Sequence, residues 1–136
     1  MQVRDYMTTD VVTANLKDGL HQTLTRMRER RVRHMPVLDE HGLLAGFISD
    51  RDIRRPDFVD PEPDQVRPFV LDNHSTVADA MSKNVSTIGP DEPVSAILGI
   101  FIERHFGALP VIEDGKVVGI LSVIDILRAF RDHLAR

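Results

Sequence analysis

The feature that most constrains this chain is an internal repeat. Residues 3–7 (VRDYM) return as residues 77–81 (VADAM), 74 positions later, and after a deletion in one turn the offset becomes 73. The further matches pair Pro36, Val37, Gly46, Ser49 and Asp52 with Pro110, Val111, Gly119, Ser122 and Asp125. A copy of roughly 55 residues has a marginal core by itself. We therefore expect the two copies to pack together about a pseudo-twofold axis.

Each copy predicts the element order βαββα, a mixed α/β (α+β) class. In the first copy we expect a strand at residues 10–14, a helix with N-cap Asp18, a hairpin of residues 35–38 and 43–49, and a short helix after Asp50. In the second copy we expect a strand at residues 84–88, a helix with N-cap Asp91, a hairpin of residues 109–113 and 117–122, and a longer helix after Val123. The apolar spacing i, i+4, i+7 indicates one buried helical face in each first helix.

The repeat also predicts the domain organisation. Residues 1–55 form the first repeat, 56–76 a connector and 77–136 the second repeat. The connector carries Pro56, Pro61, Pro63 and Pro68, and proline disfavours helix. Phe69, Val70 and Leu71 are candidates to hold it on the surface.

The first helix of the second copy is apolar on more than one stripe. Its apolar residues are Val94, Ile97, Leu98, Ile100, Phe101 and Ile102. Such a helix is expected to be covered on several sides, by the other repeat or by a second chain. We expect a homodimer, because this helical edge otherwise stays exposed.

Composition excludes several classes of function. The net charge of −4 argues against a nucleic-acid-binding protein, and the absence of cysteine excludes disulfides and thiolate chemistry. The six histidines show no metal-ligand spacing, and no nucleophile–base arrangement or glycine-rich phosphate loop is present. No apolar stretch approaches the ~20 residues of a membrane span. We expect a cytoplasmic protein without catalytic or metal-binding residues.

The Ser-x-x-Asp motif at Ser49 and Asp52, repeated at Ser122 and Asp125, supports two interpretations. It fits a helix capping box, with serine as N-cap and aspartate at N3. It also fits a nucleotide site. A carboxylate there can accept hydrogen bonds from both hydroxyls of a ribose, and the partial positive charge of a helix N-terminus favours a phosphate. The two roles are compatible.

These motifs together resemble the cystathionine-β-synthase (CBS) repeat. Residues 46–52 and 119–125 resemble its closing Gly-x-x-Ser/Thr-x-x-Asp signature, residues 5–8 and 79–82 its Asp-x-Met-Ser/Thr opening, and residues 34–37 and 108–111 its central strand. The chain is thus similar to a CBS pair, called a Bateman module. The stand-alone format resembles small bacterial CBS-pair proteins, including acetoin-utilisation accessory proteins.

The resemblance implies a regulatory module that binds an adenosine-containing ligand between its repeats: AMP, ADP, ATP or S-adenosylmethionine. It implies ligand contacts from Thr13, His34, Met35, Pro36, Ser49 and Asp52 in one site and from Thr87, Ala108, Leu109, Pro110, Ser122 and Asp125 in the other. No cofactor is required, and a partner protein that reads the ligand state is implied but not identified. The alternative is a structural dimerisation or adaptor module without a nucleotide.

The two implied sites differ in charge. Arg51 lies beside Asp52, whereas Ile124 holds the matching place beside Asp125. An arginine fork suits a phosphate and an isoleucine does not. The hypothesis is a phosphate-bearing site at Ser49, Arg51 and Asp52, and a second site that is weaker or takes an uncharged adenosine group. A solvated surface arginine is the alternative for Arg51.

Overall fold

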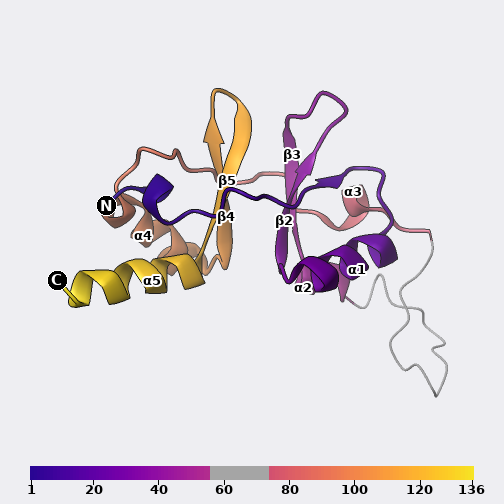
Figure 1. The fold of residues 1–136 in the computed structure, drawn as a ribbon. Coiled ribbons are helices and arrows are strands. Elements are labelled where there is room, and N and C mark those ends of the chain that lie inside the picture. The colour runs from indigo at the N-terminus through magenta and orange to yellow at the C-terminus, as the bar shows by residue number, and fades with distance from the viewer. Residues whose placement is uncertain (56–73) are drawn as a thin grey trace, which may run out of the picture. The chain divides into compact units, whose positions relative to one another are not determined.

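The computed structural model describes residues 1–55 and 74–136, which divide into two compact units (Figure 1). We call Val12–Val85 the first-repeat unit, and Met1–Val11 with Ser86–Arg136 the second-repeat unit. Most of the predicted connector, with its prolines and Phe69, Val70 and Leu71, lies outside the described residues. The division into two repeats and a connector stays a prediction.

The first-repeat unit is a three-stranded sheet with helices on its buried side. Its elements are β1 (Ala14–Asn15), α1 (Leu20–Arg30), β2 (His34–Leu38), β3 (Leu44–Ser49), α2 (Asp50–Ile53) and α3 (Val77–Ala80). The strand order is β1-β2-β3, with β1 parallel and β3 antiparallel to β2. The buried cluster joins the sheet to α1, α2 and α3, and it includes Leu20, Leu24, Met27, Met35, Val37, Ile48, Ile53 and Val77.

The second-repeat unit repeats this plan with a two-stranded sheet. Its elements are η1 (Val3–Asp5), α4 (Val94–Arg104), β4 (Ala108–Glu113), β5 (Lys116–Ser122) and α5 (Val123–Leu134). An isolated parallel bridge between Ile88 and Val111 stands in the place of a first strand. Its buried cluster is Val3, Ile88, Ile97, Phe101, Leu109, Val111 and Leu121.

The opening segment of each repeat packs against the hairpin of the other repeat. In the second-repeat unit, Thr8 exchanges both backbone hydrogen bonds with Ile120, at 2.8 and 3.0 Å. In the first-repeat unit, Ser82 exchanges both with Phe47, at 2.9 and 3.0 Å. Each compact unit is therefore completed by residues from the other repeat.

This crossing explains why the closing motif begins with glycine. A Cβ on Gly46 would overlap the Met81 side chain and come within 2.8 Å of the Ser82 carbonyl oxygen. A Cβ on Gly119 would come within 2.7 Å of Met7 Sδ and 3.0 Å of the Thr8 carbonyl oxygen. The glycine and the opening methionine are thus the two sides of one contact.

Much of the predicted architecture is confirmed. The fold is a mixed α/β tandem repeat, both hairpins begin and end within one residue of the predicted bounds, and the final helix is short in one copy and long in the other. Glycine stands at positive φ in both turns, at Gly42 and Gly115.

The predicted helix caps and first strands were wrong. The N-cap of α1 is Gly19 and that of α4 is Pro93, neither with a side-chain cap. Asp18 instead accepts a hydrogen bond from the Asn15 backbone at 3.0 Å, and Asp91 accepts one from Arg4 Nε at 2.8 Å. The predicted strand at residues 10–14 is reduced to Ala14–Asn15, and the one at 84–88 to the bridge at Ile88.

Replacing Gly46 with alanine is expected to destabilise the fold by about 1–3 kcal/mol, because the added methyl overpacks against a backbone carbonyl. Chemical denaturation measures the free energy of unfolding. Gly99→Ala is the matched control: it lies inside α4 with open space around it, so alanine should stabilise the protein by about 0.5–1 kcal/mol. Equal effects of the two substitutions would contradict the crossing contact.

Candidate functional site

The predicted site residues of the first repeat gather on one face of its sheet. Met35 and Ile48 are fully buried beneath the helices, and side chains alternate along a strand. His34 and Pro36 therefore lie on the opposite face, together with Ser49, the register partner of His34. Ala14 pairs with Val37 in the core, so Thr13, one residue before β1, belongs to the same side of the sheet as these three residues, of which Pro36 is itself buried. We call these four residues the first-repeat face.

The second repeat builds the same face from smaller residues. Leu109 and Leu121 are in its core, and Ala108 pairs with Ser122 while Pro110 pairs with Ile120. Thr87 stands one residue before the bridge at Ile88 and is exposed. The predicted residues Thr87, Ala108, Pro110 and Ser122 thus share one side of the sheet.

Five of the predicted contact residues on the strands are buried: Met35, Pro36, Ala108, Leu109 and Pro110. Met35 and Leu109 belong to the two buried clusters and are 0% and 2% exposed. Consecutive residues of a strand point to opposite faces, so naming both residues before each proline assigned one core residue to each site.

Both Ser-x-x-Asp motifs form capping boxes, which confirms the structural interpretation. Asp52 N donates to Ser49 Oγ at 3.2 Å, and Ser49 N donates to Asp52 Oδ2 at 2.9 Å. Asp125 and Ser122 make the same pair of bonds at 3.2 and 2.9 Å. One carboxylate oxygen of each aspartate is therefore occupied by the backbone.

The second carboxylate oxygen distinguishes the two aspartates. Asp52 Oδ1 lies 3.5 Å from Arg55 Nη2, and the Asp52 side chain keeps 16% of its exposure. Asp125 Oδ1 accepts a 3.1 Å bond from Arg128, its Oδ2 accepts a second bond from Ser122 Oγ, and its side chain is 4% exposed. Asp52 is therefore the more accessible of the two carboxylates.

An aromatic pair on the first-repeat face was missed by the sequence analysis. The rings of His34 and Phe47 stack with centroids 5.8 Å apart and an angle of 18° between planes. Phe47 is the register partner of Pro36, so strand alternation within the closing motif was the signal that could have found it. The second repeat has Ala108 and Ile120 at the matching places and no such pair.

Arg51 and Thr13 lie at two edges of this face. Arg51 is exposed in the four-residue helix α2, next to Asp52. The Thr13 carbonyl accepts a 3.0 Å hydrogen bond from Arg26, which also pairs with Asp18 at 3.4 Å. The half-buried Thr13 hydroxyl is thus the group that remains to contact a ligand.

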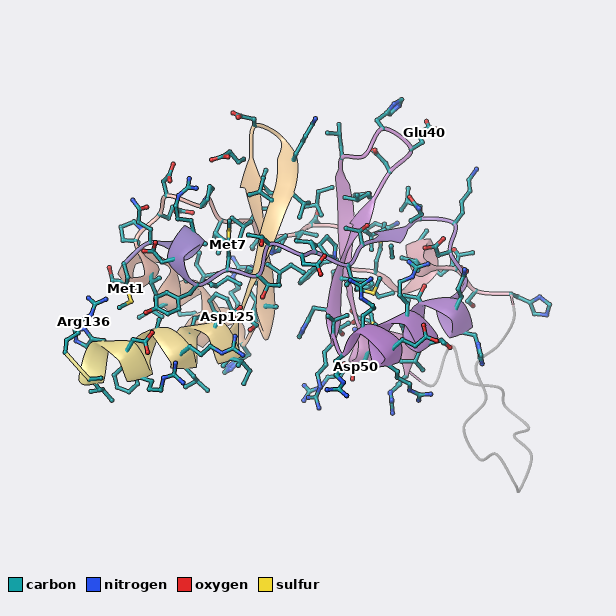
Figure 2. All side chains as sticks on the ribbon, in the orientation of Figure 1. Met1, Met7, Glu40, Asp50, Asp125 and Arg136 are labelled. Carbon is teal, nitrogen blue, oxygen red and sulfur yellow. The ribbon has the colours of Figure 1, made fainter. Side chains whose placement is uncertain are left out.

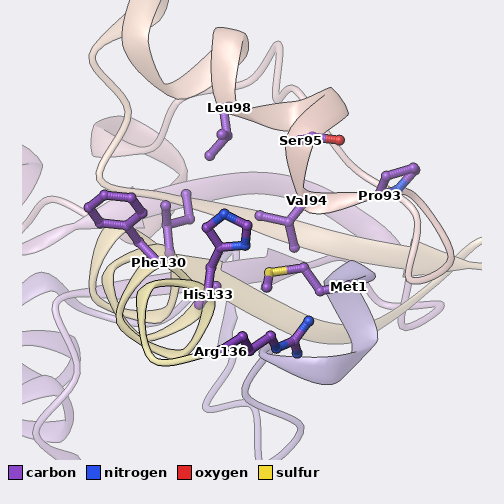
Figure 3. Close-up of a pocket in the computed structure, with 10 residues that line it drawn as sticks. Met1, Pro93, Val94, Ser95, Leu98, Phe130, His133 and Arg136 are labelled. Atoms are coloured by element: carbon purple, nitrogen blue, oxygen red, sulfur yellow. The ribbon is translucent and has the colours of Figure 1, made fainter.

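The second-repeat unit also holds an apolar groove of about 410 Å³ between α4 and α5 (Figure 3). Val94, Leu98 and Phe130 line its walls, and His133 and Arg136 stand at its rim. None of the predicted site residues lines this groove.

Among the described residues, no group of three or more His, Asp or Glu side chains could hold a metal ion. In the same part of the chain, every helix is too short or too polar to cross a membrane.

The comparisons with known proteins identify the family. The CBS domain profile matches residues 3–56 and 77–132, and the chain belongs to the CBS domain family. It is 28% identical over 129 residues to the L-aspartate semialdehyde sulfurtransferase of Methanocaldococcus jannaschii. The aligned region covers 94% of this chain but only 23% of that enzyme. The chain thus spans under a quarter of the length of this curated relative.

Solved structures share the whole fold. The CBS domain pair of protein MJ0100, in complex with 5'-methylthioadenosine and S-adenosyl-L-methionine, has a TM-score of 0.80 at 27% identity and covers 98% of both chains. A putative acetoin utilization protein from Vibrio cholerae has a TM-score of 0.79 at 21% identity, covering 99% of this chain and 93% of its own. At that identity the second likeness concerns the fold alone.

Burial lowers the pKa of His34; Asp50 and Asp52 oppose the shift, and Arg33 and Arg51 add to it. The unfolded chain therefore binds the proton first, so this residue's contribution to stability is complete above pH ~6.5 and is lost as the pH falls below that value. An NMR titration should give a midpoint for His34 below that of a blocked histidine peptide. His34→Gln should reduce the acid sensitivity of unfolding; an ordinary midpoint would contradict the burial of the imidazole.

Proposed function

We propose that this chain is a non-catalytic regulatory module that binds an adenosine-containing small molecule on the first-repeat face. The observation that carries the proposal is the gathering of Thr13, His34, Pro36 and Ser49 beside the accessible carboxylate of Asp52. The adenosine compounds bound by the CBS pair of MJ0100 support the ligand class. We infer a cytoplasmic setting and an unidentified protein that reads the ligand state.

The ligand contacts follow from the chemistry of the face. The purine stacks near His34 and Phe47, because an aromatic surface favours a flat ring. Asp52 accepts the ribose hydroxyls, and the exposed guanidinium of Arg51 pairs with a phosphate. The ligand is AMP, ADP, ATP or S-adenosylmethionine.

The second-repeat face is the weaker half of the proposal. It lacks the aromatic pair, has Ile124 in place of Arg51, and its Asp125 is almost wholly buried. A phosphate finds no cation at the place of Arg51 there. We infer that this face binds an uncharged adenosine group weakly or stays structural.

Asp52→Asn should weaken binding of both adenosine and AMP by about tenfold or more, because it removes a charged acceptor of hydrogen bonds. Arg51→Ala should weaken the binding of AMP and leave the binding of adenosine unchanged, because only AMP carries a phosphate. Isothermal titration calorimetry measures both, and thermal shift screens ADP, ATP and S-adenosylmethionine. Asp79→Asn is the matched control, since Asp79 completes the capping box of α3 with the corresponding backbone bond, at 2.8 Å against 2.9 Å for Asp52, but lies outside the site. A flat response to all these ligands would favour the adaptor alternative.

A homodimer is the second part of the proposal, and it rests on an exposed apolar face of the second-repeat unit. Ile102 on α4 is 70% exposed, and α5 exposes Ile124, Leu127, Phe130 and Leu134, each by more than half. These α5 residues follow at intervals of three or four, so they form one stripe. A twofold axis lets such a stripe pack against its own copy.

Leu127→Glu should convert the dimer into a monomer, because it places a charge within the apolar stripe. Light scattering coupled to size-exclusion chromatography measures the mass. Gln22→Glu adds the same carboxylate at an exposed position of α1 and should leave the mass unchanged. A wild-type chain that is monomeric at every accessible concentration would exclude the dimer.

A further inference from the structure

The first-repeat unit holds a strongly basic groove that the proposed adenosine site does not use. The groove encloses about 300 Å³ between α1, the loop before β2 and α2. Its walls carry Arg28, Arg31, Arg33 and Arg54, all exposed, with Asp50 as the acidic residue among them. Figure 2 shows nitrogen-tipped side chains gathered beside Asp50. We call it the arginine groove.

The charge of the arginine groove is unusual for this chain. Arg54 already has an interaction partner, but Arg28, Arg31 and Arg33 with Asp50 still give the lining a formal charge of +2, whereas the whole chain carries −4. Like charges held together raise the free energy of the folded state unless a counter-ion offsets them. Leu24, Met27 and Val32 form an apolar floor, which lowers the local dielectric and strengthens the attraction of an anion.

Comparison of the two repeats shows that the fold does not require these arginines. The matching residues of the second repeat are Ile102 for Arg28, His105 for Arg31, Gly107 for Arg33 and Leu127 for Arg54. Val123 stands in the place of Asp50. The same backbone therefore folds without an arginine or an aspartate at any of the charged positions of the groove.

We propose that the arginine groove is a separate binding site for a polyphosphate group, meaning two or more linked phosphates. Guanidinium forks bind phosphate oxygens bidentately, and the forks of Arg28, Arg31 and Arg33 match a ligand that carries several negative charges better than a single carboxylate. No residue of the groove belongs to the adenosine site, although Arg33 and Asp50 directly adjoin His34 and Ser49. The group is either the tail of a nucleotide or a free inorganic polyphosphate.

The test uses the full chain and inorganic triphosphate, which contains no adenosine. Calorimetry should show binding that weakens as the salt concentration rises. Arg31→Gly should lower the affinity about tenfold or more while the fold is kept, because Arg31 ends α1 in the left-handed region (φ 57°), where glycine is unstrained. His105→Gly makes the same backbone change at the matching position (φ 55°) and should leave the affinity unchanged.

A second pair of variants checks the side chains of the helices. Arg28→Gln should weaken triphosphate binding by a similar factor, and Arg104→Gln, on the exposed end of α4, should not. Absence of triphosphate binding to the wild type, or equal losses in variant and control, would overturn the proposal. Binding of a short single-stranded RNA without binding of triphosphate would also overturn it.

Two further titrations identify the source and separate this site from the adenosine site. Competition between ATP and triphosphate, with adenosine affinity unchanged in Arg31→Gly, supports the groove with a nucleotide tail as its ligand. Simultaneous binding of ATP and triphosphate supports the groove with a free polyphosphate as its ligand. If Asp52→Asn loses adenosine binding but retains triphosphate binding, the two sites bind their ligands independently. The adenosine proposal and the groove proposal can then be tested separately.

Discussion

The structure depends on the crossing of each opening segment over the hairpin of the other repeat. The backbone N–H and C=O of Ser82 both hydrogen-bond to Phe47, and those of Thr8 both hydrogen-bond to Ile120. Gly46 and Gly119 leave the space for Met81 and Met7 at these crossings. Neither repeat completes its own unit, so the folding of one copy requires the other. The same contact fixes the backbone of Phe47, whose ring stacks on His34 in the proposed site.

The elements that the sequence predicted well are those set by local signals. Both hairpins and both final helices follow from strand alternation, a turn glycine at positive φ and the Ser-x-x-Asp capping box. The helix starts failed because the side chains of Asp18 and Asp91 have other partners, and the partner of Asp91 is Arg4, 87 residues away. The exchange of opening segments was also out of reach, because a segment has the same local pattern whichever unit it completes.

The sequence predicted which residues surround the candidate site, but it did not predict which of them point into the core and which point to the opposite side of the sheet. Thr13, His34, Pro36 and Ser49 share a face because register and alternation put them there. Met35 and Leu109 were assigned to the site although the same alternation puts them in the cores, and Phe47 was overlooked for the same reason. The differing accessibility of Asp52 and Asp125 arises from hydrogen bonds of their second oxygens, which a shared motif does not reveal.

Duplication of a fold constrains the buried positions and leaves the exposed positions open to change. The helical surfaces of the two repeats in this chain differ in character: one is basic and the other is apolar. Arginines line the groove of the first repeat where Ile102 and Leu127 expose apolar surface in the second. Under a twofold axis, an apolar stripe is complementary to its own copy, whereas an arginine surface repels its own copy. The proposed dimer therefore pairs two second-repeat units. Assembly and anion binding are then divided between repeats that share one architecture.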